Sequence, residues 1–258
     1  MELHPLVAGF DGIAEEYELG RPSYPPDVAR AIADAAGGPR LLDVGAGTGK
    51  LSGPLLALGR DIVAVEPLDT MRAALALSIG AERVLEGTAE AIPLPDASVD
   101  GAVSSDAWHW FDGERAAAEL HRVVRPGGSV VISELVPAGG ADAPWASAMR
   151  GVLGPLRDGV GHPLARAERP EARSLEWTPP GFALGFAPFS RREDIELVHH
   201  TDRERMLAHA ASISFVGSLP ARRRGAVLAD LDARLRAAGV ERADVPYRVI
   251  LWITRRLP

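Results

Sequence analysis

The run Asp-Val-Gly-Ala-Gly-Thr-Gly at residues 43–49 carries the clearest chemical signal in this sequence. It follows a short apolar run and precedes a helical pattern, where backbone N–H groups point out of a helix end and glycines let a ligand approach the main chain. A phosphate-binding P-loop would need glycine in place of Val44 and Ser or Thr in place of Leu51, so that motif is excluded. A dinucleotide fingerprint would need a third glycine in place of Lys50, which weakens that interpretation. The spacing predicts a ligand-binding turn of the form Gly-x-Gly-x-Gly, preceded by an acid.

Short β-branched runs alternate with amphipathic helical patterns over residues 40–137, which is typical of a parallel sheet with helices on both faces. Residues 138–190 are rich in Pro, Gly and Trp, and such a long irregular stretch favours a lid or substrate-facing insertion over a linker. The expected strands are 41–44, 62–66, 83–86, 99–104, 129–135, 194–200 and 247–254. The expected helices are 25–36, 50–58, 70–78 behind an Asp69 N-cap, 113–124 behind Asp112, 145–156, 203–216 and 220–238.

Four short motifs follow one another in the first half of the chain. They are residues 41–52 (LLDVGAGTGKLS), 63–67 (VAVEP), 87–95 (GTAEAIPLP), and 107–111 (AWHWF) followed by 120–128 (LHRVVRPGG). In this order they resemble the class I S-adenosylmethionine-dependent methyltransferases, in the small-molecule group often called type 11. Residues 17–26 and 219–247 are also similar to this group, so the likeness covers most of the chain.

The resemblance implies an α/β fold, a Rossmann-like doubly wound sheet of seven strands. The last strand is antiparallel to the others and inserts between strands five and six. An N-terminal helical cap and a lid insertion after strand five complete the expected fold. We expect a single methyltransferase domain over residues 1–258, divided into the cap (1–38), the cofactor-binding core (39–137), the lid or substrate insertion (138–190) and C-terminal strands and helices (191–258).

The resemblance also implies S-adenosyl-L-methionine as the cofactor and S-adenosyl-L-homocysteine as its product. Glu66, at the end of the second strand, is then the acid that accepts both ribose hydroxyls, because two hydrogen bonds to one charged acceptor fix the sugar. A solvated acid at a strand end is the alternative interpretation. The loop residues Gly45, Ala46, Gly47 and Gly49 would approach the methionine and ribose portions.

The remaining implied contacts concern the adenine ring and the ammonium group. The family often has Asp at the position of Thr88, which leaves Glu90 as the substitute for recognising the adenine amine. Ala89 is expected to donate its backbone N–H to the ring. Asp43 is expected to orient the loop or, through water, the cofactor's ammonium group. Met71 and Ile92 would sandwich the adenine ring, but they are equally good core residues. Pro67 is the remaining implied contact.

Ligands of doubly wound sheets lie outside the carboxyl ends of the strands, so the residues after the fourth strand are expected to face the methyl group. Methyl transfer is an in-line displacement at a sulfonium carbon, so the protein mainly aligns the nucleophile and excludes water, and a base is optional. His109 is the best candidate for that base because imidazole titrates near neutrality. A purely structural role for Trp-His-Trp-Phe is the competing interpretation. The residues expected there are Ser104, Ser105, Asp106, Trp108 and His109, with Asp106 and His109 as the catalytic candidates.

Aromatic and basic residues flank this core on both sides. Tyr17, Arg21 and Tyr24 are expected to fold over the cofactor's carboxylate, with Arg21 as a bidentate partner, although ordinary packing explains them equally well. Adjacent side chains of a strand point to opposite faces, so His199 and His200 cannot both bind one metal, and no metal site is expected. The later aromatic residues either line a pocket for a flat, partly apolar acceptor or pack the lid onto the sheet: Trp145, Trp177, Phe182, Phe186 and Phe189.

Composition limits the class of protein. The 258 residues carry a net charge of −7 and 47% apolar residues, which indicates a globular core and argues against a broad nucleic-acid-binding face. Strand four also lacks the Asn/Asp-Pro-Pro-Tyr loop with which methyltransferases grip a flipped base. The absence of cysteine excludes disulfides and thiolate chemistry. The sequence has no signal-like start and no apolar run long enough to span a membrane, so we expect a soluble cytoplasmic protein that does not act at a membrane. The sequence leaves the oligomeric state open.

Four functions remain in competition at this point. The first is methyl transfer to oxygen, nitrogen or carbon of a small organic molecule, with specialised metabolism as the expected setting. The second uses the same cofactor pocket for a reaction such as cyclisation, since a pocket does not dictate its chemistry. The third is a nicotinamide-dependent oxidoreductase, which Lys50 disfavours. The fourth is a non-catalytic subunit, against which the intact glycine loop and Glu66 count.

Overall fold

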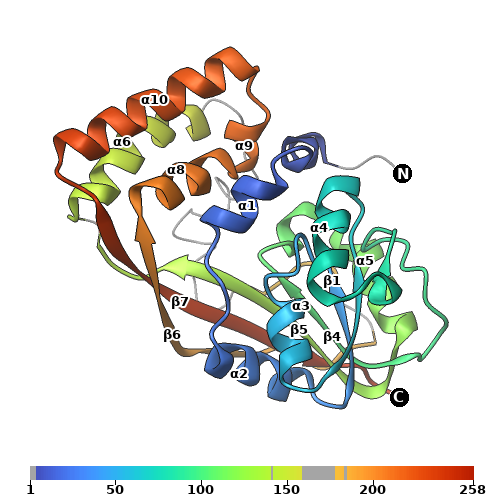
Figure 1. Ribbon diagram of the computed structural model, residues 1–258. Helices are drawn as coiled ribbons and strands as arrows, with labels where there is room; N and C mark the ends of the chain where they lie inside the picture. Colours follow the sequence, from blue (N-terminus) through green and yellow to red (C-terminus); the bar gives the residue numbers. More distant parts are fainter. Residues whose placement is uncertain (1–3, 141, 159–177, 183–184) are drawn as a thin grey trace. The chain divides into compact units, whose positions relative to one another are not determined.

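A seven-stranded sheet runs through the computed structural model, which describes residues 4–140, 142–158, 178–182 and 185–258 (Figure 1). The strands are β1 (Arg40–Val44), β2 (Asp61–Val65), β3 (Val84–Leu85), β4 (Val99–Ser105), β5 (Val124–Pro137), β6 (Ser190–Asp202) and β7 (Arg242–Arg255). Their order in the sheet is β3-β2-β1-β4-β5-β7-β6, and the last strand runs antiparallel to the others. The predicted fold class is therefore confirmed, including the insertion of the last strand between the fifth and sixth.

The middle of the sheet positions the glycine loop. β1 pairs in parallel with β2 on one side and β4 on the other, so that Asp43 lies between Ala64 and Val103. β1 is buried along its length except at Arg40, as expected of a strand covered on both faces. All seven predicted strands are present, and β3 is shorter than its predicted range of 83–86.

Most helices begin and end close to the predicted positions, whereas the helix over residues 14–20 was not among those predicted. The α-helices are α1 (Ala14–Gly20), α2 (Pro26–Ala36), α3 (Ser52–Ala57), α4 (Asp69–Ile79), α5 (Gly113–Val123), α6 (Pro144–Asp158), α8 (Arg203–Ala211), α9 (Ser214–Gly217) and α10 (Ala221–Ala237). Short 3-10 turns cover η1 (Pro5–Phe10), η2 (Ala81–Arg83) and η3 (Trp108–Trp110). α2 begins at a proline and ends at Gly37 with a positive φ of 68°, and Asp112 caps α5 by accepting from Arg115 N at 3.3 Å.

Two helix predictions were wrong in detail. Asp69 is not the N-cap of α4 but its first residue, because its carboxylate pairs with Arg72 at 2.5 Å, and Leu68 stands at the cap. The single helix predicted over 203–216 is two helices. α8 ends at Ala211, since the Ser212 hydroxyl donates to His209 O at 2.8 Å, and α9 begins after a break.

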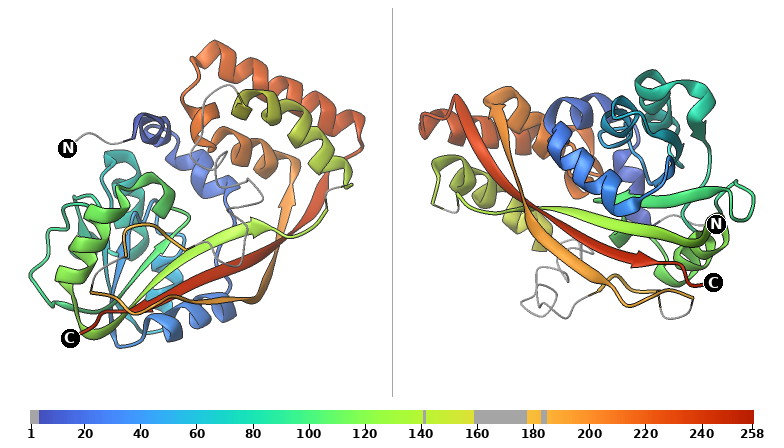
Figure 2. Two further views of the ribbon diagram at one scale, coloured as in Figure 1. Left: turned by 180° about the vertical axis from the view of Figure 1, so that it is seen from behind. Right: turned by 90° about the horizontal axis from the view of Figure 1, so that it is seen from below.

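The chain divides into two compact units. One contains Ser23–Val136, Thr178–Leu197 and Arg248–Pro258. Within it, α2, α3 and α4 contact one another in series on one face of the sheet, and α5 covers the other face (Figure 2). This agrees with the predicted placement of helices on both faces.

The second unit contains Met1–Pro22, Pro137–Trp177 and Val198–Tyr247. Its helices α6, α8, α9 and α10 share a buried cluster that includes Ala210, Val216, Leu231 and Leu235. The boundaries of these two units differ from those of the four segments expected from the sequence. The expectation of a single domain over residues 1–258 stays a prediction. Much of the expected lid, 159–177 and 183–184 with Trp177, lies outside the described residues. Within the described ranges, no helix has the length and apolar character needed to cross a lipid bilayer.

Candidate functional site

The glycine loop lies at the carboxyl end of β1 in a shape that requires glycine. Gly45, Gly47 and Gly49 have positive φ values of 69°, 59° and 93°. Gly45 N and Ala46 N both donate to Val65 O, at 3.0 and 3.2 Å, which holds the loop against the end of β2. A Cβ atom at Gly45 would lie 2.9 Å from the side chains of Ala107 and Phe111, so no larger residue fits there. The loop thus presents main chain to the space above the sheet, as its sequence predicts.

Glu66 follows β2 directly and is only 5% exposed. Its Oε2 accepts from Gly47 N at 2.9 Å, and its Oε1 accepts from Leu68 N at 3.0 Å. Burial raises the pKa of the Glu66 carboxyl, while these two N–H donors oppose the rise. A carboxylate has about four acceptor positions, so each oxygen keeps one for a further donor. Two neighbouring hydroxyl groups of a ligand match that arrangement.

Asp43, at the start of the glycine loop, connects the loop to the helix that follows it. It lies in β1, 2% exposed, and accepts from the Ser52 hydroxyl at 2.5 Å, at the start of α3. Burial is the main cause that raises the pKa of Asp43 to about 6, and the nearby charge of Glu66 adds to it. The geometry suits the predicted role of Asp43 in orienting the loop, which stays a prediction.

The predicted adenine contacts lie between β3 and β4 and on α4. Ala89, Met71 and Ile92 are buried. The Thr88 hydroxyl is also buried and has no hydrogen-bond partner among the described residues, so a ligand donor or acceptor would satisfy it. Glu90 Oε1 accepts from Asp112 N at 2.8 Å and so secures the N-terminus of α5. Pro67 follows Glu66, and its carbonyl oxygen accepts from Arg72 at 2.9 Å.

Asp106 ends β4 in a left-handed conformation, with φ of 50°, which is uncommon outside glycine. Its N–H donates to Ser133 O at 2.9 Å, and its Oδ1 accepts from Leu135 N at 3.0 Å. The Tyr24 hydroxyl donates to Asp106 Oδ2 at 3.3 Å and also contacts the Ser105 hydroxyl. Asp106 is thereby fixed against β5, one strand away from the glycine loop.

Two further hydroxyl groups lie beside Asp106. Ser105 Oγ and Ser133 Oγ are 2.5 Å apart across the β4–β5 pair. Ser104 Oγ is buried, and within the described part of the chain it has no hydrogen-bond partner. Of the residues predicted at the end of strand four, Ser105 and Asp106 are thus connected through the Tyr24 hydroxyl.

His109 lies in η3, next to a group of packed aromatic rings. Its ring centroid is 4.7 Å from that of Trp110, and Trp108 packs against Phe182 at 4.9 Å. Phe182 in turn contacts Phe186 and Phe189 at 4.9 and 5.0 Å. This packing favours the structural interpretation of the Trp-His-Trp-Phe motif, and a catalytic role for His109 stays a prediction.

Tyr17 and Arg21 belong to the helical unit, where they contact one another. The Arg21 guanidinium lies 5.2 Å from the Tyr17 ring centroid and donates to Ser212 Oγ and Ser212 O, at 2.9 and 3.0 Å. Tyr24 belongs instead to the sheet-containing unit, where it contacts Asp106. The roles of Tyr17 and Arg21 toward the cofactor stay predictions.

Sequence reasoning missed Glu134, which lies near the carboxyl end of β5. Burial raises the pKa of Glu134 to about 7, the Asp106 charge adds to the rise, and Arg191 opposes it. The available signal was an acid next to the end of the strand predicted over 129–135.

The two adjacent histidines point away from each other. His199 lines a cavity of about 40 Å³ in the helical unit together with His209, whereas the side chain of His200 is 78% exposed and pairs with Asp244 at 2.7 Å. Among the residues that the structure describes, no three His, Asp or Glu side chains are grouped so as to hold a metal ion.

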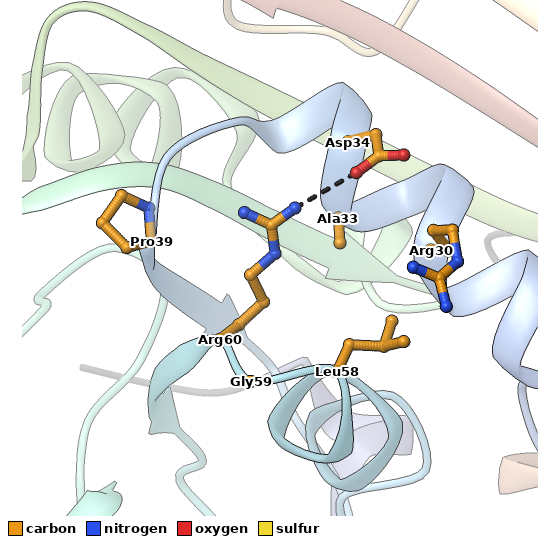
Figure 3. Close-up of a pocket in the computed structure, with 7 residues that line it drawn as sticks. All are labelled: Arg30, Ala33, Asp34, Pro39, Leu58, Gly59 and Arg60. Atoms are coloured by element: carbon orange, nitrogen blue, oxygen red, sulfur yellow. Dashed lines mark hydrogen bonds and ion pairs between the residues drawn. The ribbon is translucent and has the colours of Figure 1, made fainter.

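A hollow of about 170 Å³ lies at the amino ends of β1 and β2 (Figure 3). Arg60 extends across it, donating to Asp34 Oδ1 at 3.1 Å and Gly38 O at 2.7 Å. Ligands of doubly wound sheets bind at the opposite, carboxyl ends of the strands. The glycine loop, Glu66 and Asp106 therefore define the candidate site.

Comparison with known proteins agrees with this location. Residues 42–132 match the family model described as a methyltransferase domain. An uncharacterized methyltransferase of Mycobacterium tuberculosis is 48% identical over 127 residues, which are 48% of this chain and 50% of that protein. The chain thus matches about half the length of this relative.

Two further similarities are informative. The demethylmenaquinone methyltransferase of Renibacterium salmoninarum is 32% identical over 142 residues, 50% of this chain and 58% of that protein. A solved structure from Anaeromyxobacter dehalogenans, described as a candidate type II methyltransferase, is 28% identical with a TM-score of 0.64. It covers 92% of this chain and 99% of its own, so the similarity extends beyond the matched domain.

Proposed function

We propose that this chain, whose core belongs to the class I S-adenosylmethionine-dependent methyltransferases, transfers the cofactor's methyl group to a small organic acceptor. The single observation that carries the proposal is the buried Glu66 carboxylate, held by Gly47 N and Leu68 N beside the glycine loop. An acid in that position, with one acceptor site left on each oxygen, suits the two ribose hydroxyls of an adenosyl compound.

The other residues of the site fit the same cofactor. When bound, S-adenosylmethionine supplies an electrophilic methyl group on its sulfonium. The glycines of the loop allow close approach to the main chain, and Asp43 holds the loop through Ser52. The buried hydroxyls of Thr88 and Ser104 have no hydrogen-bond partner within the described ranges of the chain, and a bound ligand would supply one.

We infer that the acceptor is small and partly apolar, and belongs to specialised metabolism. A relative named for demethylmenaquinone supports a partly apolar acceptor. The net charge of −7 argues against nucleic acid as the substrate. Methyl transfer needs alignment of the acceptor and exclusion of water, and we assign both tasks to the residues that follow β4.

The test combines binding and turnover. Calorimetry should detect binding of S-adenosylmethionine and of S-adenosylhomocysteine. Incubation of the protein with the cofactor and pooled metabolite extracts should then yield S-adenosylhomocysteine together with a product heavier by one methylene group. Binding without any methylated product across the pools would argue for a different reaction in the same pocket. The absence of binding would overturn the proposal.

A further inference from the structure

Glu134 is a partly buried acid that the cofactor site does not use. The pairing of β4 with β5 places Ser105 opposite Ser133, so the next residues along each strand, Asp106 and Glu134, come close together. Asp106 is bound on both sides of Glu134, since its N–H donates to Ser133 O and its carboxylate accepts from Leu135 N. The two acids are thus held at a fixed spacing by backbone hydrogen bonds.

Two charged groups, on β6 and directly after β4, act on Glu134. Asp106 at the end of β4 adds negative charge, and Arg191 on β6 adds positive charge. The Arg191 guanidinium is shared, because it pairs with Glu193 at 3.1 Å and lies 5.7 Å from the ring centroid of Trp252. Burial and Asp106 prevail over Arg191, so the pKa of Glu134 is raised to about 7. At neutral pH this carboxyl can both accept and release a proton.

We propose that Glu134 is the base that takes the proton from an O–H or N–H methyl acceptor, with Asp106, held beside it through Ser133 O and Leu135 N, as the positioning residue. This rests on the proposed function. The acceptor's oxygen or nitrogen forms the new bond to the methyl carbon, the carbon–sulfur bond breaks with its electron pair going to sulfur, and the acceptor's proton moves to a Glu134 oxygen. No further reactant is needed.

The same pair of acids defines the class of acceptor. A phenol, an enol or an ammonium group carries the proton that Glu134 removes, and its approach is not opposed by Asp106. An acceptor that is already a carboxylate would bring a third negative charge to two acids and would have no proton to give. The acceptor is therefore a neutral or cationic molecule with a weakly acidic O–H or N–H.

The first test needs neither cofactor nor acceptor. Infrared difference titration of the carboxyl C=O band follows the protonated carboxylic acids of the whole protein as the pH is changed. The parent should show a carboxyl with a midpoint near 7, in addition to the steps of Asp43, near 6, and of Glu66, whose pKa is also raised. Glu134→Gln should abolish the step near 7, and Asp106→Asn should move it to lower pH by roughly one unit, since a nearby negative charge is removed. The control Glu196→Gln removes an exposed acid of β6 and should leave the near-neutral step in place.

The second test uses the acceptor found in the metabolite pools. Methyl transfer by the parent should rise with pH to a plateau above 7. Glu134→Gln should lower kcat by about 10²–10⁴-fold and remove that rise, with thermal unfolding confirming that the variant is folded.

The two proposals fail in different ways. A titration without a near-neutral carboxyl, or one that Glu134→Gln leaves unchanged, overturns this inference even if S-adenosylhomocysteine binds normally. Failure to bind S-adenosylhomocysteine, with the carboxyl titration as expected, overturns the proposed function instead. A carboxylic acid emerging as the true acceptor would also overturn the inference.

Discussion

Glu66 shows how one side chain serves the fold and the ligand together. Its two oxygens each accept one backbone N–H, so the glycine loop and the start of α4 are held by the same carboxylate that we assign to the ribose. The charge of this carboxylate is costly to bury, as its raised pKa indicates, and a polar ligand would repay part of that cost.

Glu66→Gln should weaken binding of S-adenosylhomocysteine by about 1.5–3 kcal/mol, because hydrogen bonds to a charged acceptor are replaced by weaker ones. Isothermal titration calorimetry measures this directly. Glu86→Gln is the matched control, since Glu86 is close by but 78% exposed and paired with Arg72. If both variants bind within twofold of the parent, Glu66 does not hold the ribose.

Part of the site could be predicted from the sequence because its parts are adjacent in the chain. The loop, Asp43 and Glu66 lie at the ends of two strands whose apolar patterns are plain, and glycine at positive φ leaves a readable mark. The contact between Tyr24 and Asp106 spans 82 residues, and Glu134 meets Asp106 only through the pairing of β4 with β5. No local pattern reports such contacts, so Glu134 was missed and Tyr24 was grouped with Tyr17 and Arg21.

At the scale of elements, strands and helices were predicted well and their ends less well. Apolar periodicity identifies an element because many residues contribute to it. A helix end depends on one or two hydrogen bonds, as when Asp69 pairs with Arg72 and leaves the cap to Leu68, or when the Ser212 hydroxyl binds His209 O and ends α8. The position of a helix end therefore depends on individual contacts, and the pattern of apolar residues carries no information about them.

The close packing of α1 on α8 requires glycine at position 20, because glycine has no Cβ atom. A Cβ atom at Gly20 would lie 2.1 Å from His209 N and 2.5 Å from Ala208 C, both backbone atoms that cannot move away. Gly20→Ala should therefore lower the free energy of unfolding by more than about 2 kcal/mol, a cost typical of overpacking. Chemical denaturation followed by circular dichroism measures it.

Gly225→Ala is the control for that experiment. Gly225 lies within α10 with nothing within 4 Å of its added Cβ, so alanine should stabilise the helix by roughly 0.5–1 kcal/mol. A Gly20→Ala variant as stable as the parent would mean that α1 and α8 do not approach as closely as described.

At the scale of the whole molecule, buried ionisable groups make stability depend on pH in two opposing directions. Asp43, Glu66 and Glu134 have raised pKa values, so the folded chain holds their protons more tightly than the unfolded chain. Their contributions raise the free energy of unfolding as the pH falls through the raised pKa values toward about 4. Burial lowers the pKa of His209 to about 3 from 6.5, with Arg21 adding to the effect.

His209 therefore destabilises the fold over the range from pH 6.5 down to 3, because the unfolded chain binds a proton that the folded chain refuses. The free energy of unfolding should rise as the pH is lowered from 8 to 6.5, because in this range the three acids take up protons and His209 does not contribute. Below pH 6.5 the opposing effect of His209 should offset this rise. His209→Gln should remove the offset, so its stability should keep rising toward pH 4, at up to about 1.4 kcal/mol per pH unit for each titrating group. Thermal unfolding across this range measures both profiles, and identical profiles would contradict the assignment.

The order β5-β7-β6 has a consequence for how the chain is made. On the ribosome, β6 emerges before the strand that must separate it from β5, so the nascent sheet has to keep that edge open while α8, α9 and α10 are synthesised. β7 then completes its pairings with β5 and β6, so closure of this edge depends on contacts that are distant in sequence. A stalled or shortened translation product that lacks β7 would leave two edges unpaired, and quality-control proteases should recognise it more readily than a product cut at any earlier helix of the same unit.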